Sequence, residues 1–141
     1  MRLPPENVKY IIVHQSATPR ISTTFEGIKR YHVNLGWGNI AYHYFISGDG
    51  RIKKGRSDRT QGTHTKASGM SARSLGVCLA GNFDTEKPSG PQLASLKRTL
   101  RGLMAKYKIP PQNVLGHLEV TGAVTLCPGE SLLDWIDAFR K

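Results

Sequence analysis

The pattern of apolar and polar positions predicts strands that alternate with helices along the chain. Short apolar or β-branched runs predict strands over residues 8–14, 40–46, 75–80 and 113–115, and 51–54 is expected to pair with 40–46 in a hairpin. Apolar residues at helical spacing predict helices over 23–35, 91–109 and 131–139. This alternation predicts an α/β fold, a single domain over residues 1–141 with a central mixed β-sheet covered by helices.

Local signals set the predicted boundaries of these helices. Thr23 and Glu26 have the spacing of a capping box, with Thr23 as N-cap, and Gly36 is expected to stop that helix. Pro91 suits the first turn of the second helix, which the prolines at 110–111 should end. The polar stretch 56–74 predicts a long loop, and such loops are often functional.

Charge adds a preference for anionic partners. Twenty Lys and Arg against ten Asp and Glu give a formal net charge of +10, which favours nucleic acid, acidic lipid or an anionic cell envelope. A basic surface with no dedicated partner is the alternative. Because the chain has no zinc-finger spacing and no aromatic ribonucleoprotein motif, we expect no specific nucleic-acid binding.

Hydropathy indicates neither membrane insertion nor secretion. The apolar runs are only a few residues long, too short for a transmembrane helix. Residues 1–6 lack the apolar core of a signal peptide. Of the two cysteines, Cys78 is expected in a strand and Cys127 in a turn. A disulfide between them is a minor alternative, because nothing directs the chain to an oxidising compartment.

Three residues could together hold a metal ion. His14 ends the first predicted strand, His117 follows the strand-like segment before it, and Cys127 stands ten positions later beside Pro-Gly. Two imidazoles and a thiolate suit Zn²⁺ and leave a fourth position for water, as in catalytic zinc sites. The alternative is that each histidine is a satisfied polar residue at a strand end, and spacing alone does not separate the two.

The other histidines have different expectations. His32 shares a helix face with Phe25 and Ile28, so we expect a hydrogen-bonded core residue. His43 follows Tyr42, and only one of these neighbours can face a site on a given side of a strand. His64, in the polar loop, is either a substrate contact or solvated.

Seven ordered segments resemble the type-2 N-acetylmuramoyl-L-alanine amidases, which include phage endolysins and animal peptidoglycan recognition proteins. They are Ile11–His14, Gly36–Tyr44, Gly62–His64, Ser74–Val77, Gly81–Phe83, Gly116–His117 and Cys127–Gly129. The resemblance covers nearly the whole chain. It implies a zinc hydrolase that cleaves the amide bond between N-acetylmuramic acid and L-alanine in peptidoglycan, by direct attack of a water-derived hydroxide.

The resemblance also implies roles for individual residues. His14, His117 and Cys127 would be the zinc ligands, and Tyr42 would stabilise the oxyanion or orient the nucleophile. Thr125 stands where phage enzymes often carry a catalytic lysine, so a neutral hydroxyl takes that place. His64 and Arg73 are the candidate contacts to the glycan or the peptide carboxylates.

Glu119 either orients a ligand or is a solvated surface residue. The sequence departs from the family pattern at Asn39, where Asp is usual, and at Ala41, where Gly is usual.

Two further classes of function stay open on this resemblance. Some relatives bind peptidoglycan without cleaving it, and these typically lack the ligand cysteine. A regulator of another protein is the third class, although no residue identifies it. The absent signal peptide, the small single domain and the positive charge favour an endolysin, held in the host cytoplasm until lysis. We expect the protein to be a monomer.

Overall fold

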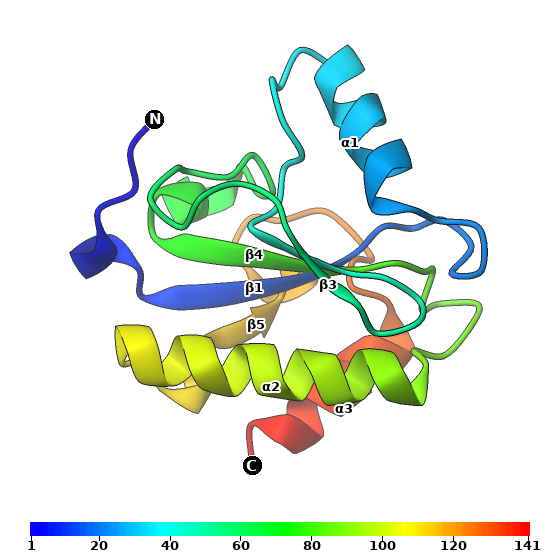
Figure 1. Ribbon diagram of the computed structural model, residues 1–141. Coiled ribbons are helices and arrows are strands. Elements are labelled where there is room, and N and C mark those ends of the chain that lie inside the picture. The colour runs from blue at the N-terminus through cyan, green and yellow to red at the C-terminus, as the bar shows by residue number, and fades with distance from the viewer.

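The computed structural model describes residues 1–141, in which five strands form one mixed sheet in the order β3-β2-β4-β1-β5 (Figure 1). The strands are β1 (Tyr10–Gln15), β2 (Tyr44–Ile46), β3 (Ile52–Lys54), β4 (Ser74–Leu79) and β5 (Val114–Gly116). β1 pairs in parallel with β4 and β5, β2 is parallel to β4, and only β2 and β3 are antiparallel. The α/β fold and the hairpin are therefore confirmed.

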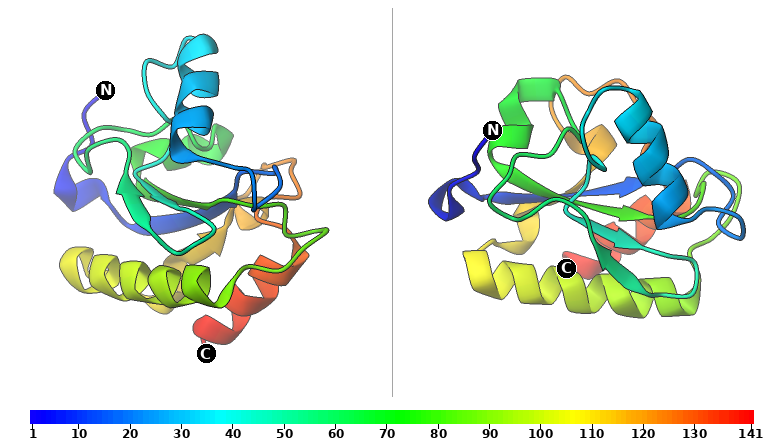
Figure 2. Two further views of the ribbon diagram at one scale, coloured as in Figure 1. Left: turned by 45° about the vertical axis from the view of Figure 1, so that its right-hand side comes forward. Right: turned by 45° about the horizontal axis from the view of Figure 1, so that its top comes forward.

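Two helices cover one face of the sheet. α2 (Gly90–Tyr107) and α3 (Glu130–Phe139) lie against it, while α1 (Phe25–Asn34) stands on the opposite side in every view (Figures 1 and 2). Alternate residues of β1 and β4, among them Val13 and Val77, pack with Leu96, Leu100 and Leu132 in the largest buried cluster. This cluster is the main core, because it joins both long strands to both helices.

The opposite face carries two smaller buried clusters with a gap between them. One joins Phe45 and Cys78 to the inner side of α1, around Phe25 and Ile28. The other joins Ile12 to Met70 and Val120, which belong to or follow the short 3-10 helices η2 (Ala67–Ala72) and η4 (His117–Glu119). The next β1 side chain on this face after Ile12 therefore lies between these two clusters.

The strand predicted over 40–46 is wrong for its first half. Only Tyr44–Ile46 is strand, because the long loop takes up the backbone groups before it. The Arg56 guanidinium donates to the carbonyl of Ile40 at 2.8 Å, and the Thr63 amide donates to the carbonyl of Ala41 at 3.2 Å. A half-buried arginine from elsewhere in the chain leaves no local trace in a strand pattern.

Several helix boundaries also differ from the prediction. Thr24, not Thr23, caps α1, and its hydroxyl accepts from the Gly27 amide at 3.0 Å. α2 ends at a left-handed Lys108 with φ of 57°, before the prolines are reached. No helix in the structure combines the length and the apolar character that crossing a bilayer requires. The predicted loop over 56–74 is present, although η2 interrupts it.

Candidate metal centre

The two histidine candidates meet because their strands are neighbours. β1 and β5 run in parallel with Val13 opposite Gly116, so the residues that follow this pair lie side by side at the same edge. His14 is 2% exposed, and its ring centroid lies 4.6 Å from that of His117. Parallel pairing thus brings together two imidazoles from opposite ends of the chain.

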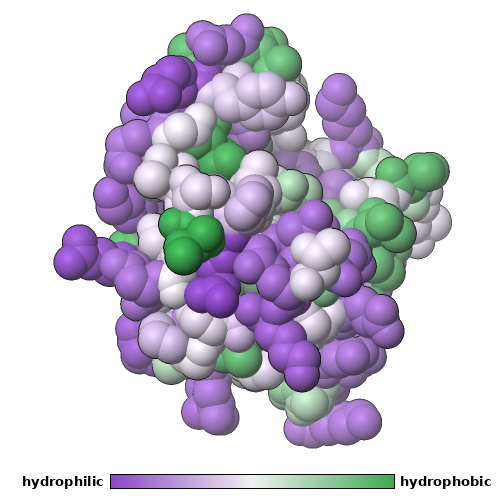
Figure 3. Space-filling model, turned by 90° about the vertical axis from the view of Figure 1, so that its right-hand side faces the viewer, coloured by the Kyte–Doolittle hydropathy of each residue, from purple (hydrophilic) through white to green (hydrophobic).

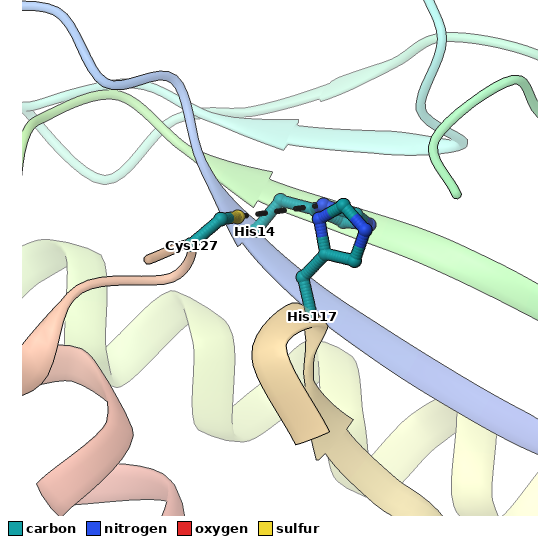
Figure 4. A group of neighbouring side chains, drawn as sticks. All are labelled: His14, His117 and Cys127. Atoms are coloured by element: carbon teal, nitrogen blue, oxygen red, sulfur yellow. Dashed lines mark hydrogen bonds between the residues drawn. The ribbon is translucent and has the colours of Figure 1, made fainter. Parts of the chain in front are cut away.

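Cys127 completes the group from the loop before α3 (Figure 4). Its Sγ lies 3.6 Å from His14 Nδ1, and the Gln15 amide donates to the same sulfur at 3.2 Å. The Leu118 amide donates to the Cys127 carbonyl at 2.8 Å, which ties this loop to the turn that carries His117. One ligand atom from each of the three residues lies within 4.8 Å of the others. This nitrogen–nitrogen–sulfur set fits a tetrahedral zinc ion with one open position.

Burial sets the charge of the three ligands. Burial and the neighbouring histidines lower the pKa of His14 well below 6.5, and burial lowers the pKa of His117. Both rings are therefore neutral at pH 7 and can offer a lone pair. Burial raises the pKa of the Cys127 thiol to about 12 against the opposing Gln15 amide, so a cation is needed to ionise the sulfur.

Tyr42 is the member of the Tyr42–His43 pair that faces the centre. Its ring centroid lies 5.1 Å from that of His14. Burial, followed by the nearby Cys78 and Cys127, raises the pKa of its phenol well above 10. The phenol is therefore a hydrogen-bond donor at neutral pH.

Two candidates near the centre have structural contacts. The Thr125 hydroxyl oxygen accepts from the Cys127 amide at 3.1 Å, which leaves its proton free. Glu119 accepts from the Gly116 amide at 2.8 Å and pairs with Arg140 at 2.7 and 3.0 Å. Glu119 therefore braces the turn that carries His117, which is an orienting role.

The two predicted substrate contacts lie in different places. His64 is 5% exposed and sits against His14, with its Nδ1 2.8 Å from His14 Nε2. Arg73 precedes β4 and lies over the Tyr10 ring at 5.5 Å. Since Cys78 pairs with His14 and Arg73 precedes Cys78 by five residues, Arg73 is ~16 Å along the strand direction from the ligands.

A groove of about 510 Å³ opens beside His117 and His64. Loop residues line its two sides: Thr63, Thr65, Lys66, Ala67, Gly122, Ala123 and Val124. The Thr65 hydroxyl is buried and has no hydrogen-bond partner. The groove therefore reaches one of the candidate ligands, His117, and has a lysine in its lining.

The remaining histidine and cysteine expectations can be compared directly. His32 is a core residue as predicted, and its Nδ1 accepts from the Ala41 amide at 3.0 Å. Both cysteines are free, so the alternative of a Cys78–Cys127 disulfide is wrong. Sequence reasoning did not single out Gln15, whose amide binds the ligand sulfur; its position next to His14 is the only signal for it.

A family model for N-acetylmuramoyl-L-alanine amidase matches residues 4–130. The chain belongs to this amidase family. Among curated relatives, the endolysin of Escherichia phage T7 is 34% identical over 136 residues, which cover 92% of this chain and 86% of that protein. Peptidoglycan-recognition protein SC2 of Drosophila melanogaster is 29% identical over 133 residues, covering 89% and 70%.

Solved structures show the same likeness to the amidase family. The N-acetylmuramoyl-L-alanine amidase LysC from Clostridium intestinale superposes with a TM-score of 0.82 and 32% identity, covering 98% of this chain and 89% of that one. The peptidoglycan recognition protein PGRP-SA of Apis mellifera gives a TM-score of 0.83 and 26% identity, covering 96% and 84%. The predicted family membership is therefore confirmed.

Proposed function

We propose that the protein is a zinc-dependent amidase that hydrolyses the bond between N-acetylmuramic acid and L-alanine in peptidoglycan. The observation that carries this proposal is the convergence of His14, His117 and Cys127 within 4.8 Å in a chain of the amidase family. Zinc held there would supply a Lewis acid for the amide carbonyl and lower the pKa of a water molecule. The protein residues supply orientation and proton donors.

In this proposal Tyr42 and Thr125 are the catalytic side chains. The Tyr42 phenol stays protonated, so it donates a hydrogen bond to the carbonyl oxygen as negative charge develops there. The Thr125 hydroxyl, in the loop that carries Cys127, can donate its free proton in a hydrogen bond to the substrate. A neutral hydroxyl stabilises an anion less than a lysine would, so more of the stabilisation falls to Tyr42.

We place the peptide stem of the substrate in the groove beside His117. The Lys66 ammonium, on the wall of this groove, suits a stem carboxylate. The proposed contact of Arg73 lies beyond this groove and requires a longer segment of the polymer. Binding of soluble muropeptides to Lys66→Ala and Arg73→Ala tests the two contacts separately.

Mass analysis of digested peptidoglycan tests the activity. We expect new L-alanine amino termini with zinc, none with a chelator, and none from Cys127→Ser. Wall pelleting of the same samples distinguishes the binding-module alternative, in which wild type and Cys127→Ser bind equally and neither cleaves. Absence of cleavage by zinc-loaded wild type would refute the proposal.

We further propose that the enzyme acts as a monomeric phage endolysin. The likeness to the T7 endolysin supports this role. On the face in Figure 3, hydrophobic side chains form only small groups in a mainly hydrophilic surface, which supports a monomer. Expression in bacteria should cause lysis only when a membrane-permeabilising protein is co-expressed. Lysis without that second protein would contradict an enzyme held in the host cytoplasm.

A further inference from the structure

The His64 ring occupies a slot made by two glycines. A Cβ on Gly62 would lie 2.5 Å from His64 Cδ2, and a Cβ on Gly76 would lie 2.7 Å from His64 Cγ. Real side chains do not approach so closely, so the ring fits only because both positions lack a Cβ. The slot holds the imidazole against the strand backbone with little freedom to rotate.

Hydrogen bonds on the far side of the ring assign its proton. The Ser74 hydroxyl donates to the Met70 carbonyl at 2.7 Å, which uses its single proton. His64 Nε2 lies 3.4 Å from the same hydroxyl oxygen, so the ring must be the donor there. His64 is 5% exposed and its nitrogens face an imidazole and a hydroxyl rather than a carboxylate, so the buried ring is neutral and carries one proton. That proton is on Nε2, and Nδ1 is an acceptor.

This assignment determines the state of His14. His64 Nδ1 and His14 Nε2 are 2.8 Å apart, and an acceptor on His64 requires a donor on His14. His14 therefore carries its proton on Nε2. Its Nδ1 is left with a lone pair, and this is the atom that lies 3.6 Å from Cys127 Sγ.

We propose that His64 is a positioning residue that selects the metal-binding tautomer of His14. The chain of donors runs from His14 through His64 and Ser74 to the Met70 carbonyl, which can only accept. The inference rests on the proposed zinc site for its purpose, but the tautomer itself is a property of the metal-free protein. It also means that both nitrogens of His64 already have partners in the protein.

The size of the effect that such hydrogen-bond partners have on metal affinity is known in general. Groups that hydrogen-bond the second nitrogen of a metal-binding histidine change metal affinity by about 10–100-fold when removed. His64→Asn keeps an acceptor oxygen near the position of Nδ1. The leucine of His64→Leu has nearly the same shape as that asparagine but has no acceptor atom. The two variants form a matched pair in which a loss of packing alone would affect both equally.

The first measurement is the ¹⁵N spectrum of the His14 ring in chelator-treated protein. We expect one tautomer with the proton on Nε2 in wild type and in His64→Asn, and a mixture in His64→Leu. A proton on Nδ1 of His14 in wild type would overturn the inference. This measurement on wild type requires no variant to fold.

The second measurement is zinc affinity by competition with a chromophoric chelator. We expect His64→Leu to bind zinc about 10–100-fold more weakly than wild type, and His64→Asn to stay within a few-fold. Equal losses in both variants, or none in either, would refute a role in selecting the tautomer. If wild type and Cys127→Ser bind zinc equally weakly, the proposed zinc function fails instead, while the ¹⁵N result still decides the inference.

Discussion

His43 should make the free energy of unfolding depend on pH between about 4 and 6.5. The side chain is fully buried, its Nδ1 accepts from the Gly76 amide at 3.0 Å, and its Nε2 donates to the Thr60 carbonyl at 2.7 Å. Burial lowers the pKa of His43 from 6.5 to about 4, against the hydrogen bond to Thr60 that raises it. Native protein therefore holds this ring neutral where an unfolded chain would protonate it.

The sign and size follow from this difference. Between pH 6.5 and about 4 the unfolded chain binds a proton that the native state does not, so stability falls as the pH falls. The full contribution is present above about pH 6.5. At about 1.4 kcal/mol per tenfold change in proton affinity, ~3 kcal/mol is lost by about pH 4 and ~2 kcal/mol by about pH 5.

Urea unfolding of wild type and His43→Asn, followed by tryptophan fluorescence with chelator present, isolates the pH-dependent contribution of His43 to stability. Asparagine can still accept from the Gly76 amide but does not titrate. The variant should be less stable by roughly 1–3 kcal/mol at neutral pH, because it loses a buried bond. That gap should shrink by ~2 kcal/mol at about pH 5 and stay constant above about pH 7. A gap that is constant over the whole range would refute the reasoning.

Four substitutions test other parts of the structure. Tyr42→Phe should lower kcat by about 10²–10³-fold with zinc affinity unchanged; a change in KM alone would argue against a catalytic phenol. Leu100→Ala, at a fully buried position, should cost about 2–5 kcal/mol in urea unfolding. Ser89→Ala removes the cap that accepts from Gln92 and should cost ~1 kcal/mol in the same assay. Gly129→Ala should weaken zinc binding as well as stability, because φ is 87° and a Cβ would lie 2.6 Å from the Phe83 carbonyl carbon; unchanged zinc affinity would show that the loop adapts.

The sequence predicted best those strands in which nearly every consecutive residue is buried. β1 and β4 lie inside the sheet between two parallel neighbours, so their sequences are almost continuously apolar. The boundaries were less predictable, because they depend on distant partners such as the Arg56 guanidinium on the Ile40 carbonyl. A pattern of local hydropathy contains no information about that contact.

The candidate site was likewise predictable only in part. His14 and His117 could be named because strand ends collect ligands in parallel sheets, but their approach to 4.6 Å depends on β1 pairing with β5. The contact between His64 and His14 was not predictable, since it requires the slot at Gly62 and Gly76. A glycine in a loop and another in a strand give no local sign that they face one ring.

The position of β1 in the sheet has a consequence for synthesis. β1 leaves the ribosome first among the strands, yet its neighbours β4 and β5 begin at Ser74 and Val114. Pairings so distant in sequence form slowly and late. His14 must therefore wait for most of the chain, and its partner Cys127 is added later still. A nascent chain has no assembled centre before Cys127 has been synthesised, so the proposed hydrolase stays inactive up to that point.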